Sequence, residues 1–133
     1  MSEKRLINVS QMPVRWGDMD AYGHVNNTVY FRYAEQCRWE WLEKMELAPG
    51  REPTEGPVIV NASCTFLIPI TYPATLEIRM YAGDGGRSSV ETHYEIRVLG
   101  DARLYAEGSA KVVWIDMVSG KSKPLPEALR AQI

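Results

Sequence analysis

The sequence predicts an α+β fold in which a curved antiparallel β-sheet of about five strands wraps around one long α-helix. One segment has apolar residues at helical spacing, and four later segments alternate apolar and polar residues with a period of two. At about 3.3 Å per residue, strands of ten or more residues are longer than the helix, so a sheet that curves around the helix is the economical packing. We expect the 133 residues to form a single domain, residues 1–133.

The first half of the chain predicts one strand and the helix. Residues 7–16 contain β-branched side chains and are predicted to form a strand, which Pro13 favours at a sheet edge. A polar turn follows, and a helix is then predicted to end before Pro49-Gly50. Its apolar stripe consists of Tyr30, Tyr33, Ala34, Cys37, Trp41 and Met45, and the segment Asn26-Asn27-Thr28 offers capping side chains.

The second half predicts four strands. Apolar and polar residues alternate over residues 58–68, 76–82, 90–98 and 104–114. The turn sequences GDGGR and LGDAR favour antiparallel hairpins between the last three of these strands. Such a roll leaves a sheet edge free, and pairing of edges across a two-fold axis would protect it. We therefore expect a homo-oligomer, a dimer or a tetramer.

Composition excludes several classes of function. A formal net charge of -2 offers no positive field for a nucleic acid. The N-terminus lacks a signal peptide and no segment is apolar over the ~18 residues of a membrane span, so a cytoplasmic protein is expected. Cys37 and Cys64 are predicted to be reduced core thiols.

The segment most informative about chemistry is Asp18 to Tyr30. It brings two carboxylates, an imidazole and two carboxamides into a turn that opens a helix. A helix N-terminus offers unpaired N–H groups and a positive dipole potential that can stabilise an oxyanion, and a carboxylate beside it can act as base or nucleophile. These same residue types also build turns and caps, which is the structural alternative.

Metal and cofactor sites are not predicted. Asp18, Asp20 and Gly23 have the spacing of a calcium loop, but Tyr22 and Val29 stand where ligands are needed. His24 and His93 are the only histidines, so a zinc site lacks ligands. The sequence has neither a phosphate-binding loop nor a dinucleotide fingerprint. No cofactor is expected.

The segment WGDMDAYGHVNNTVYFRYAEQCRWEWL resembles the signature of hot-dog-fold acyl-CoA thioesterases of the 4-hydroxybenzoyl-CoA thioesterase class, nearest the fatty acyl-CoA branch. The similarity is strong over residues 14–42 and collinear through the later strands. It implies a hot-dog fold and an acyl-CoA substrate. The function expected from it is hydrolysis of a fatty acyl or aryl thioester, with an acyl-carrier-protein thioesterase or a non-catalytic acyl-thioester binding protein as alternatives.

The resemblance also implies roles for residues. Asp20 matches the catalytic carboxylate, as general base or nucleophile, and Asn27 matches the helix start whose N–H groups hold the oxyanion. His24 and Asn26 are candidates for positioning the thioester, Asp20 or the lytic water, while Asp18 is expected to be structural. Glu35, on the helix, is not expected to be the carboxylate because Asp20 is present. The residues expected to contact substrate are Tyr30, Arg87, Ser88 and Ser89.

Overall fold

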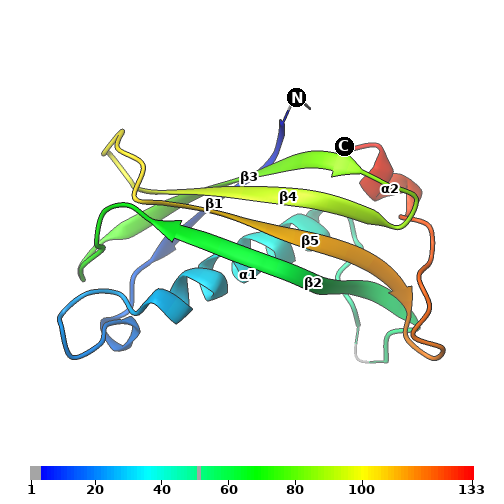
Figure 1. Cartoon of the computed structure of the whole chain (residues 1–133), viewed down its shortest axis with the longest axis horizontal. Helices are drawn as coiled ribbons and strands as arrows, with labels where there is room; N and C mark the ends of the chain where they lie inside the picture. Colours follow the sequence, from blue (N-terminus) through cyan, green and yellow to red (C-terminus); the bar gives the residue numbers. More distant parts are fainter. Residues whose placement is uncertain (1–3, 51) are drawn as a thin grey trace.

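The structure is a computed structural model that describes residues 4–50 and 52–133. Its elements follow one another as β1 (Arg5–Pro13), a short 3₁₀ turn (Trp16–Asp18), α1 (Asn27–Lys44), β2 (Glu55–Phe66), β3 (Thr75–Gly85), β4 (Ser89–Val98), β5 (Ala106–Asp116) and α2 (Glu127–Arg130). The five strands form one antiparallel sheet in the order β1-β3-β4-β5-β2, with α1 lying along one face (Figure 1). The predicted α+β class and the central helix are confirmed.

The core lies between the sheet and α1. In β3 the apolar residues Leu76, Ile78 and Met80 are fully buried, while Glu77 and Arg79 between them are not. β4 and β5 repeat this alternation, and α1 contributes Tyr30, Tyr33, Cys37, Trp41 and Leu42. The period of two in the sequence is therefore the period of burial, as predicted.

Local signals set the ends of α1. Asn26 has an extended backbone, and its side chain accepts the N–H of Thr28, which starts the helix at Asn27. At the other end Glu46 adopts a positive φ of 57°, and the N–H of Leu47 bonds back to the carbonyl of Leu42. The helix therefore ends before Pro49, as the sequence predicts.

The first strand starts and ends earlier than expected, at Arg5 and Pro13 in place of residues 7 and 16. β1 ends at Pro13, and the predicted continuation to Trp16 instead turns into the 3₁₀ segment. The reason is that Asp18 accepts the N–H of Arg15 and closes this turn. β1 does lie at an edge of the sheet, the position that Pro13 favours.

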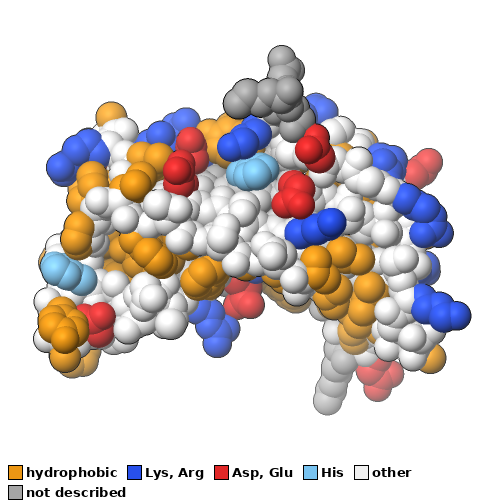
Figure 2. All heavy atoms as spheres, in the orientation of Figure 1, with side chains coloured by type: hydrophobic (Ala, Val, Ile, Leu, Met, Phe, Trp, Pro, Cys, Tyr) orange, Lys and Arg blue, Asp and Glu red, His pale blue; other side chains and the backbone are white. Residues whose placement is uncertain are grey.

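β2 forms the opposite edge and shows an unexpected pattern of exposure. Residues 59–63 are exposed in succession, so neither face of this stretch is covered. The register shifts between Ile59 and Asn61, which leaves Val60 outside the ladder and 57% exposed. The alternation predicted for residues 58–68 is therefore only partly realised as burial. In Figure 2, hydrophobic side chains gather along the side of the molecule where Figure 1 draws β2.

The C-terminal segment closes one end of the core. Leu125 and Leu129 are buried, and α2 was not predicted from the sequence. The Arg130 guanidinium donates to the carbonyl oxygens of Gly86 and Arg87, at the turn between β3 and β4. Within the described residues, no helix is long and apolar enough to cross a membrane. Both cysteines are free thiols, Cys37 buried and Cys64 partly buried.

Candidate active site

Residues 18–26 form a small hairpin that leads directly into α1. The N–H of Asp20 donates to the carbonyl oxygen of His24, and the N–H of Asn26 donates to the carbonyl oxygen of Asp18, both at 2.9 Å. The turn needs Gly23, which has a φ of 78°. Asp20 and His24 stand opposite each other across this hairpin, which places their side chains on the same face.

The carboxylate of Asp20 is only partly engaged. Its Oδ1 accepts the N–H of Tyr22 at 2.9 Å, which orients the side chain over the turn. Its second oxygen accepts no hydrogen bond from any residue that the structure describes. Asp20 is partly buried and His24 is exposed. One carboxylate oxygen is thus held in place while the other is available.

Asp18 anchors the hairpin to the helix. Its Oδ2 accepts the N–H of Arg15 at 3.0 Å and the hydroxyl of Tyr33 at 2.7 Å. Burial is the larger cause and the contact with Asp18 the smaller cause of a Tyr33 pKa far above its ordinary value. The hydroxyl therefore stays protonated and keeps donating. The N–H of Val25 bonds to the carbonyl of Ile70 and fixes the other arm. Asp18 has the structural role expected of it.

The helix start presents one open donor. Asn26 caps α1, because its Oδ1 accepts the N–H of Thr28 at 2.9 Å and the Thr28 hydroxyl at 2.6 Å. The backbone N–H of Asn27 has no acceptor in the described part of the chain. It lies in the first turn, where the helix dipole is positive. This N–H is suited to hold a developing negative charge.

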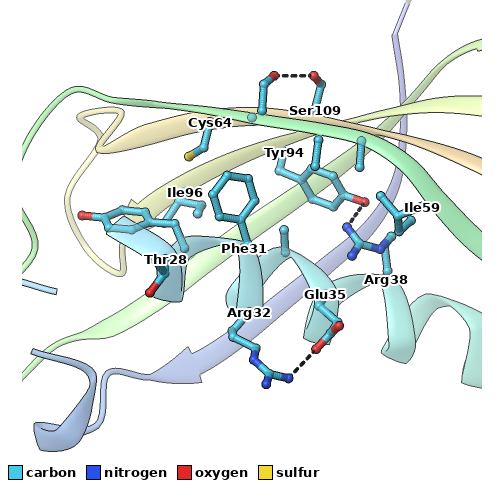
Figure 3. Close-up of a pocket in the computed structure, with 16 residues that line it drawn as sticks. Thr28, Phe31, Arg32, Glu35, Arg38, Ile59, Cys64, Tyr94, Ile96 and Ser109 are labelled. Atoms are coloured by element: carbon cyan, nitrogen blue, oxygen red, sulfur yellow. Dashed lines mark hydrogen bonds and ion pairs between the residues drawn. The ribbon is translucent and has the colours of Figure 1, made fainter. Parts of the chain in front are cut away.

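A cavity of about 320 Å³ begins beside this helix start and runs between α1 and the strands β2, β4 and β5 (Figure 3). From α1 it is lined by residues three or four positions apart, which places them on one helix face: Thr28, Phe31, Arg32, Glu35 and Arg38. The sheet contributes mostly small or apolar side chains, among them Ile59, Ala62, Cys64 and Ile96. The cavity is therefore suited to an apolar group.

Two arginines with different partners lie on the helix side of this cavity. Arg32 and Glu35 form an ion pair at 3.1 Å, and both side chains are largely exposed. Arg38 instead donates to the Tyr94 hydroxyl at 3.1 Å (Figure 3). A smaller apolar cavity of about 180 Å³ continues beyond Arg38 toward Trp41 and Pro49. Arg38 was not singled out in the sequence, where only its spacing from Phe31 on one helix face could have indicated it.

Close approach of two strands shapes the sheet side. At Gly108 in β5, a β-carbon would lie 2.7 Å from the carbonyl oxygen of Ser63 in β2. Glycine is therefore required for β2 to pack against β5 at the cavity wall.

The structure brings together some of the predicted site residues. Tyr30 lines the cavity, although it is 4% exposed and packs edge-on against Phe66 at 4.8 Å. Asp20, His24, Asn26 and Asn27 precede Thr28, the first lining residue, and do not line the cavity themselves. Glu35, which was not expected to be the carboxylate, does line it.

Arg87, Ser88 and Ser89 lie at the other end of the sheet. The carbonyl of Ser88 accepts the N–H of Trp114 and that of Arg87 accepts the N–H of Leu125, near α2. The hairpin lies at the opposite end, where the N–H of Val14 donates to the carbonyl oxygen of Ala74. β3 runs between these two ends of the sheet, over about 30 Å (Figure 1). Within this chain these three residues therefore lie apart from Asp20.

The residues described show no group of three or more histidine, cysteine or acidic side chains placed to bind a metal ion. A curved antiparallel sheet around one long helix is the architecture of the hot-dog class of proteins. Comparison with known proteins specifies the family. Residues 14–133 match the Thioesterase-like superfamily, and the chain belongs to this superfamily.

Individual relatives support this placement. The chain is similar to PA2801, described as a putative thioesterase from Pseudomonas aeruginosa, with a TM-score of 0.92 and 41% identity over 96% of this chain and 98% of that one. It is 25% identical to the long-chain acyl-CoA thioesterase FadM of Escherichia coli, over 93% of this chain and 95% of FadM. Slr0204, a 1,4-dihydroxy-2-naphthoyl-CoA thioesterase from Synechocystis, shares the fold with a TM-score of 0.86 at 21% identity, covering 95% and 94% of the two chains.

Proposed function

We propose that this protein hydrolyses acyl-CoA thioesters, with Asp20 as its catalytic carboxylate. The observation that carries the proposal is the arrangement of the hairpin. It leaves one oxygen of Asp20 and the N–H of Asn27 without a partner among the described residues, in the segment that leads directly to Thr28, the first residue that lines the cavity. Membership of the thioesterase superfamily and the similarity to FadM support it.

The chemistry follows from these groups. Water adds its oxygen to the thioester carbonyl carbon, the carbon–sulfur bond breaks, and the CoA thiolate leaves and is protonated. Asp20 either takes the proton from water or attacks the carbonyl itself to form an anhydride that water then opens. The Asn27 N–H receives the negative charge that forms on the carbonyl oxygen. We assign to His24, opposite Asp20 across the hairpin, the role of orienting this carboxylate.

The decisive variant is Asp20→Asn, which keeps the shape and the acceptor for the Tyr22 N–H but removes the charge. We expect turnover on a panel of acyl-CoAs, read as released CoA thiol, to fall by at least about a hundredfold. Circular dichroism and thermal melting serve to confirm that the fold is kept. Near-normal turnover by this variant would refute Asp20 as the carboxylate.

Glu35 is a second candidate for the carboxylate because it lines the cavity directly. The matched variant is Glu35→Gln, which also removes one charge without changing size. We expect Glu35→Gln to retain most of the activity. If Glu35→Gln loses turnover while Asp20→Asn keeps it, the reaction centre lies on the helix and not on the hairpin.

We also propose that the protein acts as a homodimer paired through β2. The start of β2 lies near Ser88, because Pro57 pairs with Trp114 and the Trp114 N–H bonds to Ser88. The end of β2 leads to Ile70, which contacts the hairpin at Val25. An antiparallel two-fold pairing of β2 strands therefore brings the partner's Arg87 to the Asp20 end. This gives Arg87, Ser88 and Ser89 their expected place beside the CoA moiety.

A further inference from the structure

Arg38 differs from the arginines that form ion pairs in this protein. It is partly buried on α1 and faces the cavity between the helix and the sheet. Within residues 4–50 and 52–133, no carboxylate lies within ion-pair distance of it, whereas Arg32, six residues earlier on α1, pairs with Glu35. A partly buried cation without an anion is costly unless a partner arrives.

The hydrogen bonds of Arg38 leave most of its donors free. The only acceptor that it meets among the described side chains is the Tyr94 hydroxyl, at 3.1 Å. A guanidinium has five N–H donors, so most of them remain for a ligand. The planar fork of these donors matches a carboxylate.

The position of Arg38 is fixed from the sheet side. The Tyr94 hydroxyl bonds to the Thr92 hydroxyl at 2.8 Å, and the Thr92 hydroxyl donates to the carbonyl of Ala110 at 2.7 Å. Thr92 and Tyr94 are almost completely buried. Since the Thr92 proton goes to Ala110, Tyr94 donates to Thr92 and offers its oxygen to Arg38 (Figure 3). This chain of hydrogen bonds holds the guanidinium at a defined depth.

That depth suits the far end of an acyl group. Thr28 marks the start of the cavity, next to the Asn27 N–H, and Arg38 lies ten residues further along the helix, which is about 15 Å. Between them Phe31, Ala34 and Ile96 face the space, and the two charged residues of this stretch, Arg32 and Glu35, pair with each other. A group that enters at the helix start therefore meets hydrocarbon first and a cation afterwards.

We propose that the preferred substrates are acyl-CoAs whose acyl group carries an acceptor oxygen, best a carboxylate, at the end remote from the thioester, and that Arg38 binds this oxygen. The inference deepens the proposed thioesterase function and rests on it. A purely alkyl chain of the same length would cover the Arg38 cation without replacing the water that it loses.

The test compares matched thioesters: adipoyl-, suberoyl- and sebacoyl-CoA against hexanoyl-, octanoyl- and decanoyl-CoA, with 8-hydroxyoctanoyl-CoA as the uncharged oxygen source. The variant is Arg38→Met, which keeps a long apolar stem and removes the cation. Arg79→Met, on β3 and paired with Glu77 at 2.8 Å, is the charge-matched control outside the cavity.

We expect Arg38→Met to lower the ratio of kcat/KM for suberoyl- over octanoyl-CoA by about tenfold to a hundredfold, the contribution of a hydrogen bond to a charged group. Arg79→Met should leave this ratio unchanged. A larger effect on suberoyl- than on 8-hydroxyoctanoyl-CoA identifies the carboxylate as the preferred oxygen. A ratio that Arg38→Met leaves unchanged overturns the inference.

Binding separates this inference from the proposed reaction. Isothermal titration of suberoyl- and octanoyl-CoA into Asp20→Asn, with and without Arg38→Met, measures selectivity without turnover. If the wild-type protein cleaves none of the thioesters, the proposed function fails. The role of Arg38 is decided by a different result: it is overturned if Arg38→Met leaves a preference for suberoyl-CoA unchanged in this titration.

Discussion

Two carboxylates that are two residues apart have different surroundings in this protein. Asp18 accepts hydrogen bonds from Arg15 and Tyr33, and it joins the hairpin to α1. Asp20 accepts one bond from the neighbouring Tyr22 and keeps an open oxygen. The difference follows from their places in the chain. Asp18 ends the 3₁₀ turn, where the Tyr33 hydroxyl of α1 reaches its side chain, whereas Asp20 opens the tight turn of the hairpin and meets only the N–H of Tyr22.

The contact between Asp18 and Tyr33 predicts a stability that depends on pH. Because the pKa of Tyr33 is raised in the folded state, its contribution is complete below the unfolded value near 10 and is lost as the pH rises toward the folded value. Tyr33→Phe should lower the free energy of unfolding by about 2 kcal/mol at neutral pH. It should also make the decline above pH 10 less steep, as measured by urea unfolding across the alkaline range.

Tyr22→Phe is the control for this prediction. Tyr22 lies in the same hairpin but is 88% exposed. Its replacement should change the free energy of unfolding by no more than about 0.5 kcal/mol at any pH of the series. Equal alkaline profiles for Tyr33→Phe and the wild-type protein would show that the Asp18 contact does not stabilise the fold.

Some of the candidate site could be predicted from sequence because its residues are neighbours in the chain. Asp20, His24 and Asn27 fall within eight positions, so a hairpin that opens a helix holds all three in one short segment, with Asp20 paired to His24. Arg38 could not be assigned in this way. Its partner Tyr94 is 56 positions away, and the contact depends on which strand lies over the helix.

Among the elements, β2 is the strand whose surroundings the sequence predicts least well. Its alternating residues indicate burial on one face, but residues 59–63 are exposed on both. By contrast β3 and β4, in the interior of the sheet, bury alternate residues as their pattern predicts. Alternation reports the face of a strand, but not whether a neighbouring surface covers that face.

Pairing of β2 across a two-fold axis can be tested at Val60. Val60→Lys places a charge on the edge and should disfavour strand pairing. We expect sedimentation velocity to show a dimer for the wild-type protein and a monomer for this variant. Activity should fall as well, because the partner's Arg87 is then absent from the site.

The opposite edge supplies the control. Val9 in β1 is 41% exposed, and Val9→Lys introduces the same charge on the other edge strand. This variant should remain a dimer with normal activity. A dimer that survives Val60→Lys but not Val9→Lys would place the interface on β1.

In the whole molecule, the two ends of the sheet have separate roles. One end carries the hairpin and the start of the cavity, and the other is closed by the C-terminal segment (Figure 1). The sequence and its family resemblance predicted the sheet around the helix. They did not predict α2, because a four-residue helix has too few turns to show a period.

Closure of this second end should contribute strongly to stability. Leu129 is fully buried in α2, and Leu129→Ala removes apolar contacts and leaves a void. We expect a loss of about 3 kcal/mol in the free energy of unfolding, measured by urea denaturation. Val118→Ala, at a residue that is 89% exposed, should change it by less than about 0.5 kcal/mol. A loss below 1 kcal/mol for Leu129→Ala would mean that the C-terminal segment is dispensable for the core.

The glycine at position 108 limits how this protein can diverge. Any β-carbon there would collide with the Ser63 carbonyl, so a larger residue would push the outer strand away before it could narrow the space beneath. Evolution or protein engineering can therefore resize the compartment through exchanges on the helix, at positions such as Phe31 and Ala34, while position 108 of the sheet is closed to that route.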